Sequence, residues 1–296
     1  MLTHLDSISG APSRAVVLGS RGFVGRYTVA GLQAAGVPVE AIASTDIDLT
    51  DPASVEALRA RFRPEDAVVI VSGLTPDRGR DIATLMRNLQ MVQHVCAALA
   101  ASPVAHVVHV GSDAVYHDDA NPVRESSCAQ PSSFHGVMHM TRERMLIESM
   151  RASKTPLALL RPSILYGPGD THNAYGPNRF VRTALVDGRI ALFGGGEEQR
   201  DHVFIEDVAT IIRLVLQRRS SGVLNLVTGT SHAFAEVART VAELAGRPVA
   251  IEPSPRANPI THRHFDVTAR IQAFPDLQMT TLADGLRRSV EAARRG

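Results

Sequence analysis

Short apolar runs alternate with stretches of helical period along the first 165 residues of the chain. The apolar runs are residues 14–18, 39–43, 67–71, 104–110 and 157–160. The stretches of helical period are residues 27–35, 52–62, 79–101 and one that opens at Ser133. Strands that alternate with helices are typical of a parallel sheet with right-handed crossovers. The pattern therefore predicts an α/β fold, a doubly wound parallel sheet of the Rossmann type.

The first apolar run ends in a glycine-rich turn, GSRGFVG at residues 19–25, that leads directly into a helical stretch. Glycines at this spacing permit a tight turn, close approach of backbone to a pyrophosphate, and close packing of helix on strand. The N–H groups at the start of the helix would bind the anion. The turn therefore predicts a dinucleotide cofactor held by Gly19, Gly22, Phe23, Val24 and Gly25.

Beyond residue 165 the order of elements is less regular. We expect helices at 179–187, 206–217, 234–245 and 282–294, with a strand at 223–227. No internal repeat or clean linker divides the sequence. We expect residues 12–165 to form mainly the dinucleotide-binding core and residues 166–296 mainly a smaller C-terminal substrate-binding lobe, with returns to the core in a single compact unit. Such a lobe would close a cleft at the carboxyl ends of the strands, where open α/β sheets bind ligands.

Composition narrows the class of protein. With 296 residues, 44% of them apolar, the chain can bury a substantial core, and its formal net charge is only +1. No free-standing run of Lys or Arg indicates a nucleic-acid or membrane-surface partner, and no apolar run reaches the roughly 18 residues of a membrane helix. We therefore expect a cytoplasmic protein. Cys96 and Cys128 lack CxxC spacing, so we expect no metal site and no disulfide framework.

Further motifs follow the glycine turn in a fixed order. They are Asn88 in the long helix, GSDAVY at 111–116, LRPSILYGPG at 160–169, RDHVFIEDV at 200–208, and NL at 225–226. Together these motifs resemble the extended short-chain dehydrogenase/reductase family, specifically its nucleotide-sugar epimerases, dehydratases and reductases. The resemblance implies an NAD(P)-dependent oxidoreductase or epimerase that transfers hydride at a carbon of a nucleotide-activated sugar. It also implies a cofactor contact at Asn88 and a homodimer formed through two long helices.

The resemblance implies catalytic roles at Ser112 and in the helix that opens at Ser133. Ser112 stands where the family carries a catalytic Ser or Thr, whose hydroxyl can bond the reacting oxygen of the substrate. The alternative role for Ser112 is to cap the strand end. The family pattern Tyr-Gly-x-Ser-Lys-x-x-x-Glu falls on HGVMHMTRE at 135–143. Glycine and glutamate match, but His135 and His139 stand in place of the Tyr and the Lys.

The loss of both Tyr and Lys is chemically coherent. The only lysine of the chain is Lys154, and no tyrosine precedes it by four residues, so a shifted alignment does not restore the pair. A tyrosine needs a nearby cation to lower its pKa from about 10, whereas an imidazole titrates near 6.5, at about neutral pH, unaided. We expect His135 to be the general acid/base, and His139 to bond the nicotinamide ribose or orient His135. The alternative is a catalytically impaired cofactor-binding or sensor protein without turnover.

Residues near the second strand bear on the choice of cofactor. An acid at the end of that strand would favour NAD, but Ala43 and Ser44 occupy this position. Arg21 resembles the arginine that some reductases of the family place near the 2′-phosphate of NADP, and Asp48 and Leu49 resemble the stretch that flanks the adenine. NADP(H) is therefore favoured, with NAD(H) as the alternative.

Arginines of the second half are the candidates for substrate binding. Arg200 matches the arginine that family members use on the nucleotide diphosphate, and a guanidinium suits bidentate phosphate contact. Asn178 and Arg263 are further candidates for phosphate or nucleotide contact. The sequence leaves open whether the protein is a 4-keto-sugar reductase, which Arg21 favours, or an epimerase, to which the GSDAVY and RDHV motifs belong equally well.

Overall fold

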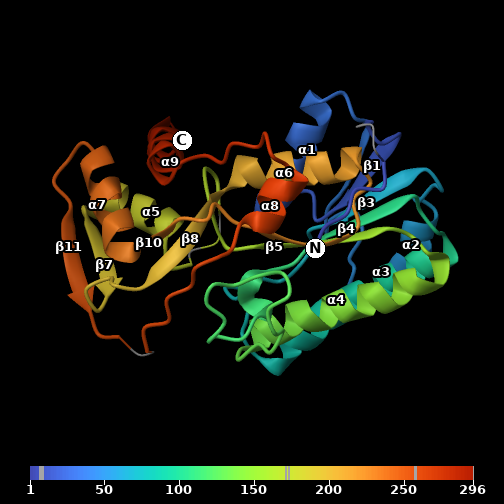
Figure 1. Ribbon diagram of the computed structural model, residues 1–296, viewed down its shortest axis with the longest axis horizontal. Helices are drawn as coiled ribbons and strands as arrows, with labels where there is room; N and C mark the ends of the chain where they lie inside the picture. The colour runs from blue at the N-terminus through green and yellow to red at the C-terminus, as the bar shows by residue number, and fades with distance from the viewer. Residues whose placement is uncertain (7–9, 171, 173, 257–258, 296) are drawn as a thin grey trace. The chain divides into compact units, whose positions relative to one another are not determined.

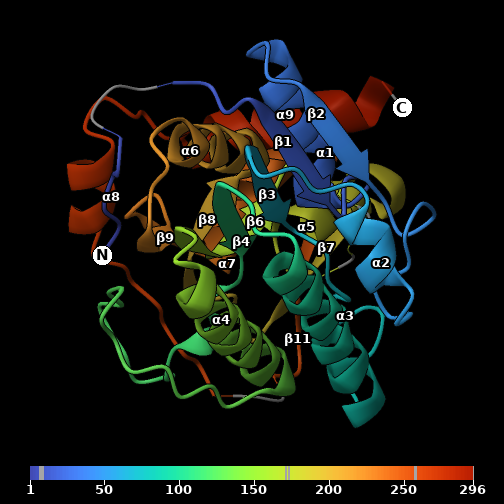
Figure 2. The ribbon, with the colours of Figure 1, turned by 90° about the vertical axis from the view of Figure 1, so that its right-hand side faces the viewer.

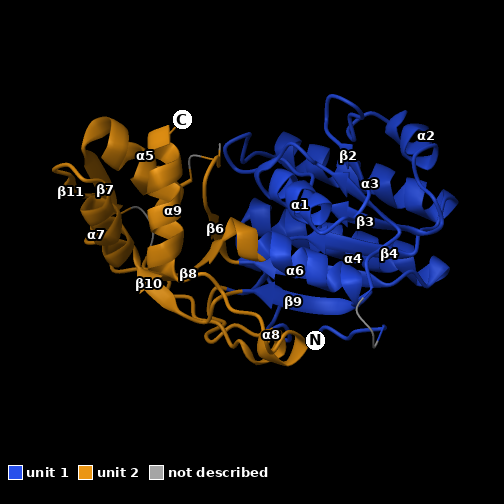
Figure 3. Cartoon of the chain, turned by 90° about the horizontal axis from the view of Figure 1, so that it is seen from above, with its two compact units in different colours: residues 1–117, 125–162, 208–226 blue, residues 118–124, 163–207, 227–296 orange. Residues whose placement is uncertain are grey.

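A computed structural model of the chain describes residues 1–6, 10–170, 172, 174–256 and 259–295 (Figure 1). The chain divides into two units, which are coloured separately in Figure 3. Unit 1 comprises Met1–His117, Glu125–Pro162 and Val208–Leu226, and unit 2 comprises Asp118–Arg124, Ser163–Asp207 and Val227–Gly296. The sequence pattern placed a boundary at residue 165, whereas the chain leaves unit 1 after Pro162 and returns to it at Val208.

Among the described residues of unit 1, six parallel strands form a sheet in the order β2-β1-β3-β4-β5-β9. The strands are β1 (Arg14–Leu18), β2 (Val39–Ile42), β3 (Asp66–Ile70), β4 (His106–Val110), β5 (Leu157–Pro162) and β9 (Gly222–Leu226). Leu18 at the end of β1 pairs with Ile42 of β2 on one side and with Ile70 of β3 on the other. The order reverses between β1 and β3, so this junction is the switch point at which doubly wound sheets bind ligands. The predicted Rossmann-type fold is confirmed.

Helices cover both faces of this sheet, with α3 and α4 on one face and α1 and α6 on the other (Figures 1 and 2). The helices are α1 (Phe23–Ala34), α2 (Ser54–Arg59), α3 (Ile82–Ala101), α4 (Phe134–Ser153) and α6 (Ile205–Gln217), of which the last begins in unit 2. The start of α3 lies three residues after the predicted Gly79, because Asp81 accepts a hydrogen bond from the Thr84 N–H at 2.8 Å and caps the helix there. Leu99 of α3 and Leu146 of α4 are fully buried in the core beneath the sheet.

In the described part of unit 2, short strands and helices pack around a core of aromatic and aliphatic side chains. The strands are β6 (Ile164–Tyr166), β7 (Arg189–Phe193), β8 (Gln199–Phe204), β10 (Ser231–Ala233) and β11 (Ala250–Ser254). The helices are α5 (Pro177–Asp187), α7 (Phe234–Leu244) and α9 (Leu282–Arg295), and a short helix α8 (Thr268–Ala273) precedes α9. Strands β10, β8 and β6 form one sheet, and β11 pairs with β7 in another. Tyr166, Phe180, Phe204 and Phe234 lie in the buried core of this unit.

No helix in the described ranges is both long enough and apolar enough to cross a membrane.

Candidate functional site

The glycine turn joins β1 to α1 at the switch point of the sheet. Gly19 has φ of +93°, and a Cβ on it would lie 2.8 Å from the Cα of Ser72, which follows β3. A Cβ on Gly25 would lie 2.1 Å from the Gly19 carbonyl oxygen. Glycine is therefore required for β1, the loop after β3 and the first turn of α1 to meet at this spacing.

The first turn of α1 is suited to an anion. The helix begins at Phe23, and its N-cap residue Gly22 has no side chain to accept hydrogen bonds from the first N–H groups. This first turn, which is fully described, contains no acidic residue. Unpartnered amides and the helix dipole favour a phosphate at such a terminus. Residues 19–25 thus form a backbone cradle that fits the pyrophosphate of a dinucleotide.

A cavity of about 380 Å³ lies beside the glycine turn, and Arg21, Arg26 and Asp46 are among its lining residues. The Arg21 Nη1 donates a hydrogen bond to the Thr45 hydroxyl at 3.1 Å, which places the guanidinium over the end of β2. The Asp46 carboxylate accepts the Ala43 N–H at 2.8 Å. The cavity therefore carries two guanidinium groups and a carboxylate that already binds the backbone.

Three residues predicted to contact the cofactor make contacts with other residues of unit 1. Asp48 is exposed, and hydrogen bonds from the Thr50 N–H and hydroxyl lower the pKa of its carboxyl group. Leu49 is buried in the core, with only 6% of its surface exposed. Asn88 accepts the Leu74 N–H at 2.8 Å and donates to the Leu74 carbonyl at 3.1 Å, so it shapes the loop after β3.

Ser112 lies next to the first turn of α4. Its hydroxyl oxygen accepts the Ala114 N–H at 3.1 Å and so caps the short 3₁₀ turn Asp113–Val115. A Cβ on Gly136 would lie 2.2 Å from the Ala114 carbonyl oxygen. Gly136 therefore allows α4 to contact this turn. His135 directly precedes Gly136, so it lies beside the Ser112 turn.

His135 and His139 are in contact along one face of α4. Their ring centroids are 4.6 Å apart and the rings are nearly perpendicular, at 87°. His135 is half-buried and borders a cavity of about 370 Å³, whose lining includes Leu74 and Asn88. The His139 Nδ1 is buried and has no hydrogen-bond partner among the described residues. Burial, aided by electrostatic interaction with His135 and Arg142, lowers the pKa of His139 well below its ordinary value, so this ring is neutral at pH 7.

Tyr116, the tyrosine of the GSDAVY motif, is part of the core. Only 1% of its surface is exposed. Its hydroxyl donates to the Asn225 side-chain oxygen at 2.7 Å and accepts a hydrogen bond from Arg161 at 2.9 Å. Burial raises the pKa of Tyr116 to about 12. These contacts assign Tyr116 to packing rather than to proton transfer.

Arg142, three residues after His139, was not singled out by the sequence motifs. Its side chain is 1% exposed, and its Nη2 donates to the Ser72 carbonyl at 2.6 Å. A Cβ on Gly73 would lie 2.9 Å from the Arg142 Nη1. Burial lowers the pKa of this guanidinium to about 10. Arg142 thus connects the histidine helix to the loop after β3.

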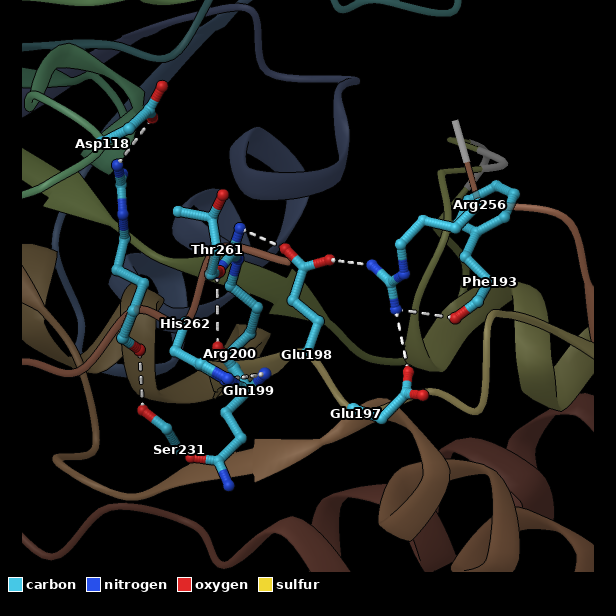
Figure 4. Close-up of polar contacts among 11 residues, drawn as sticks. Asp118, Phe193, Glu197, Glu198, Gln199, Arg200, Ser231, Arg256, Thr261 and His262 are labelled. Atoms are coloured by element: carbon cyan, nitrogen blue, oxygen red, sulfur yellow. Dashed lines mark hydrogen bonds and ion pairs between the residues drawn. The ribbon is translucent and has the colours of Figure 1, made fainter. Parts of the chain in front are cut away.

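The predicted substrate residues lie in unit 2, where each has polar partners. Arg200 forms an ion pair with Glu198 at 2.5 Å and donates to the Thr261 carbonyl (Figure 4). Arg263 is 6% exposed and forms an ion pair with Asp118 at 3.3 Å. The Asn178 side chain braces its own loop, since it accepts the Gly167 N–H at 3.0 Å and donates to Asp170 at 2.7 Å.

The comparisons with known proteins agree with this geometry. The family model described as the NAD dependent epimerase/dehydratase family matches residues 15–227. The chain belongs to this family. Its resemblance to extended short-chain dehydrogenases/reductases is thereby confirmed.

Individual members of the epimerase/dehydratase family align with most of the chain. A UDP-glucose 4-epimerase of Mycolicibacterium smegmatis is 27% identical over 257 residues, which are 83% of this chain and 81% of that protein. A dTDP-6-deoxy-L-talose 4-dehydrogenase (NAD(P)(+)) of Kitasatospora kifunensis is also 27% identical, over 94% of both chains. The crystal structure of Thermus thermophilus UDP-glucose 4-epimerase with NAD superposes with a TM-score of 0.84 at 22% identity, and covers 95% of this chain and 99% of that one.

In this epimerase/dehydratase chain the predicted residues fall into two groups. Unit 1 brings Ser112, His135 and His139 together, and unit 2 holds Asn178, Arg200 and Arg263. Motif reasoning missed Arg142 in unit 1 and also Arg256 in unit 2, which pairs with Glu197 and Glu198. Arg256 lies in an irregular stretch after β11, where neither periodicity nor a motif marks it.

Proposed function

We propose that this protein is an NAD(P)-dependent enzyme acting on a nucleotide-activated sugar, a 4-keto-sugar reductase or an epimerase, in which His135 exchanges the proton. The observation that carries the proposal is the contact between His135 and a neutral His139 next to the Ser112 turn. Relatives whose names give a UDP-glucose epimerase and a dTDP-sugar dehydrogenase support the substrate class.

The chain's own residues divide the work as follows. The amides of residues 19–25 hold the cofactor pyrophosphate, and the nicotinamide, when bound, supplies or accepts hydride at a sugar carbon. The Ser112 hydroxyl donates a hydrogen bond to the reacting oxygen of the sugar. His135 takes the proton from this oxygen or returns it. His139 stays neutral and can therefore orient His135 or bond the nicotinamide ribose without adding a second charge.

We favour NADP(H) as cofactor, with NAD(H) as the alternative. Arg21 and Arg26 border the cavity at the end of β2, and the Asp46 carboxylate there already accepts a backbone N–H. Two guanidinium groups suit a 2′-phosphate, and an engaged carboxylate is less available to a ribose hydroxyl. Asp48 and Leu49 complete this part of the proposal as residues that flank the adenine, and Asn88 as the residue that shapes the loop after β3.

In unit 2 we assign Arg200 and Arg263 to the nucleotide diphosphate and Asn178 to the loop beside it. We further propose a homodimer through α3 and α4. Large apolar side chains at the start of these helices are exposed, namely Ile82 by 66%, Met86 by 49% and Phe134 by 49%. A partner surface would remove them from water.

The test is a cofactor-linked assay. The purified protein is loaded in turn with NADPH and NAD and mixed with a panel of nucleotide 4-keto-sugars and nucleotide hexoses. Absorbance near about 340 nm follows the reduced nicotinamide, and the products are analysed separately. A reductase consumes NADPH with a 4-keto-sugar, and an epimerase inverts a hexose with tightly held NAD. Bound cofactor with neither an absorbance change nor a new product would overturn the proposed activity and favour a sensor.

A further inference from the structure

Two arginines of unit 2 share one carboxylate. Glu198 Oε1 lies 2.5 Å from the Arg200 Nη2, and its Oε2 lies 3.2 Å from the Arg256 Nη1. Figure 4 shows this carboxylate between the two guanidinium groups. All three side chains are about 20% exposed or slightly less. One carboxylate thus bridges two cations, with one oxygen on each, in a half-buried setting.

A phosphate oxygen pair makes the same kind of contact with guanidinium groups as a carboxylate does. The bridging carboxylate therefore occupies the contacts that a diphosphate would make with this pair of arginines. It also cancels charge, because Glu197 and Glu198 together neutralise Arg200 and Arg256. A multiply charged anion gains little from a neutral cluster, since the cost of its desolvation is not offset.

Glu198 differs in this respect from its neighbour. The Glu197 carboxylate accepts the Gly195 N–H at 3.1 Å, and backbone hydrogen bonds lower the pKa of this group. Backbone contact holds Glu197 on its loop. In the described part of the chain, the contacts of the Glu198 carboxylate are the guanidinium groups of Arg200 and Arg256. A single side-chain rotation of Glu198 would remove this carboxylate from both arginines together, while Arg200 keeps its contact with the Thr261 carbonyl and Arg256 keeps those with Glu197 and the Phe193 carbonyl.

We propose that Glu198 is an internal counter-anion of the arginine pair Arg200 and Arg256, which a nucleoside diphosphate displaces on binding. The inference rests on the proposed nucleotide-sugar function, which it deepens by naming the residue that sets the affinity for diphosphate. Displacement of Glu198 favours ligands that can engage both arginines. Removal of this carboxylate therefore strengthens the binding of a diphosphate, which engages both arginines, more than the binding of a monophosphate.

The experiment measures binding of UDP, dTDP, GDP, UMP and inorganic pyrophosphate to the full chain by calorimetry at low and moderate salt. Three proteins are compared: wild type, Glu198→Gln, and the matched control Glu197→Gln. The Glu198→Gln variant should bind its preferred nucleoside diphosphate and pyrophosphate roughly tenfold more tightly than wild type, with a steeper salt dependence. It should bind UMP with a smaller gain. The Glu197→Gln variant should stay within about threefold of wild type.

Glu198→Ala removes the carboxylate without adding an amide and should give the same rank order, which guards against misfolding of one variant. Equal or weaker binding of pyrophosphate and every nucleotide by both Glu198 variants would overturn the inference. An equal gain in Glu197→Gln would also overturn it, because the effect would then be one of net charge. Tighter pyrophosphate binding by the Glu198 variants, with no nucleoside diphosphate bound by any protein, would support the counter-anion and refute the nucleotide-sugar function.

Discussion

Glu143 and Arg161 form a doubly hydrogen-bonded ion pair inside unit 1. The Arg161 Nε donates to one carboxylate oxygen at 2.9 Å, and its Nη2 donates to the other at 2.6 Å. The side chains are 4% and 9% exposed. The pair ties α4 to β5, and the remaining Arg161 nitrogen bonds the Tyr116 hydroxyl. It therefore fixes the position of the histidine helix over the sheet.

Removing one partner of this pair should destabilise unit 1 strongly. We expect Glu143→Gln to lower the free energy of unfolding by about 3–5 kcal/mol, because the arginine stays buried without a counter-charge. The matched control is Glu148→Gln on the same helix, whose pair with Arg151 is about 70% exposed and should cost less than about 1 kcal/mol. Denaturant unfolding of both variants measures the difference. Similar losses in the two variants would contradict a structural role for the buried pair.

His135 should be required for turnover but not for folding. We expect His135→Asn to lower kcat by roughly 10²- to 10⁴-fold, because asparagine cannot exchange a proton near neutral pH. The affinity for the dinucleotide should stay unchanged. Tyr116→Phe is the control, because the Tyr116 hydroxyl is another group in unit 1 that could donate a proton. It should keep kcat within about threefold while losing about 1 kcal/mol of stability with its hydrogen bonds. Full activity in His135→Asn together with loss in Tyr116→Phe would transfer the role to the tyrosine.

Two glycine substitutions in α1 test whether the glycine turn binds the dinucleotide. We expect Gly25→Ala to abolish dinucleotide binding, because its Cβ would lie 2.1 Å from the Gly19 carbonyl oxygen. Gly31→Ala is the matched control, since its Cβ would make an ordinary contact with Ala209 at 3.7 Å. It should raise stability by about 0.5–1 kcal/mol and leave cofactor affinity unchanged. Fluorescence titration with NADH and NADPH measures the affinities, and equal behaviour of the two variants would refute the cradle.

Arg21 should distinguish the two cofactors. We expect Arg21→Ala to weaken NADPH binding roughly tenfold, because a charge-assisted contact to the 2′-phosphate is lost. NADH lacks this phosphate and serves as the internal control, so its affinity should hardly change. Dissociation constants for both dinucleotides, measured on wild type and variant, give the result. A parallel loss for NADH and NADPH would mean that Arg21 acts through its contact with Thr45 rather than through the phosphate.

The parts of the fold that sequence could predict are those with strong local signals. Strand β3, with the sequence DAVVI, is fully buried and contains the β-branched run Val68, Val69 and Ile70, and the predicted strand differs from it by one residue at each end. Strand β11, with the sequence AIEPS, is mostly exposed and carries no such signal. Its pairing with β7 depends on a segment about 60 residues away, which local pattern does not reveal.

The same limit applies to the site. The order of motifs along the chain marked Ser112 and His135, and the packing of Gly136 against Ala114 gives the physical reason that they lie together. Nothing local shows that the Arg142 guanidinium turns inward to the Ser72 carbonyl, 70 residues away in sequence. The contact of Arg256 with Glu198 spans 58 residues and is equally invisible to motif reasoning. The structure therefore adds the hydrogen bonds and ion pairs that arginines make with residues far away in the sequence.

The buried imidazole of His202 should make the stability of the protein depend on pH in the acid range. It lies in β8, is 2% exposed, and packs edge-on against Phe234 with ring centroids 5.6 Å apart. Burial lowers the pKa of His202 to about 3, from an ordinary value of 6.5. The unfolded chain therefore binds a proton at this residue before the folded chain does. Protonation favours unfolding as the pH falls below about 6.5, and the stability contributed by the neutral ring is lost between that pH and the native pKa.

His202→Phe keeps an aromatic ring in this position and removes its titration. We expect the variant to match wild type within about 1 kcal/mol at pH 7.5, where the histidine is neutral in both states. Below pH 6.5 the variant should become more stable than wild type by about 1.4 kcal/mol for each further pH unit, as long as both proteins remain folded. Denaturant unfolding of both proteins at about pH 7.5, 6.0 and 5.0 measures how the difference in their stability changes with pH. Parallel stability curves would mean that His202 gains its proton equally in the folded and unfolded chains, because only a difference in pKa between the two states makes stability depend on pH.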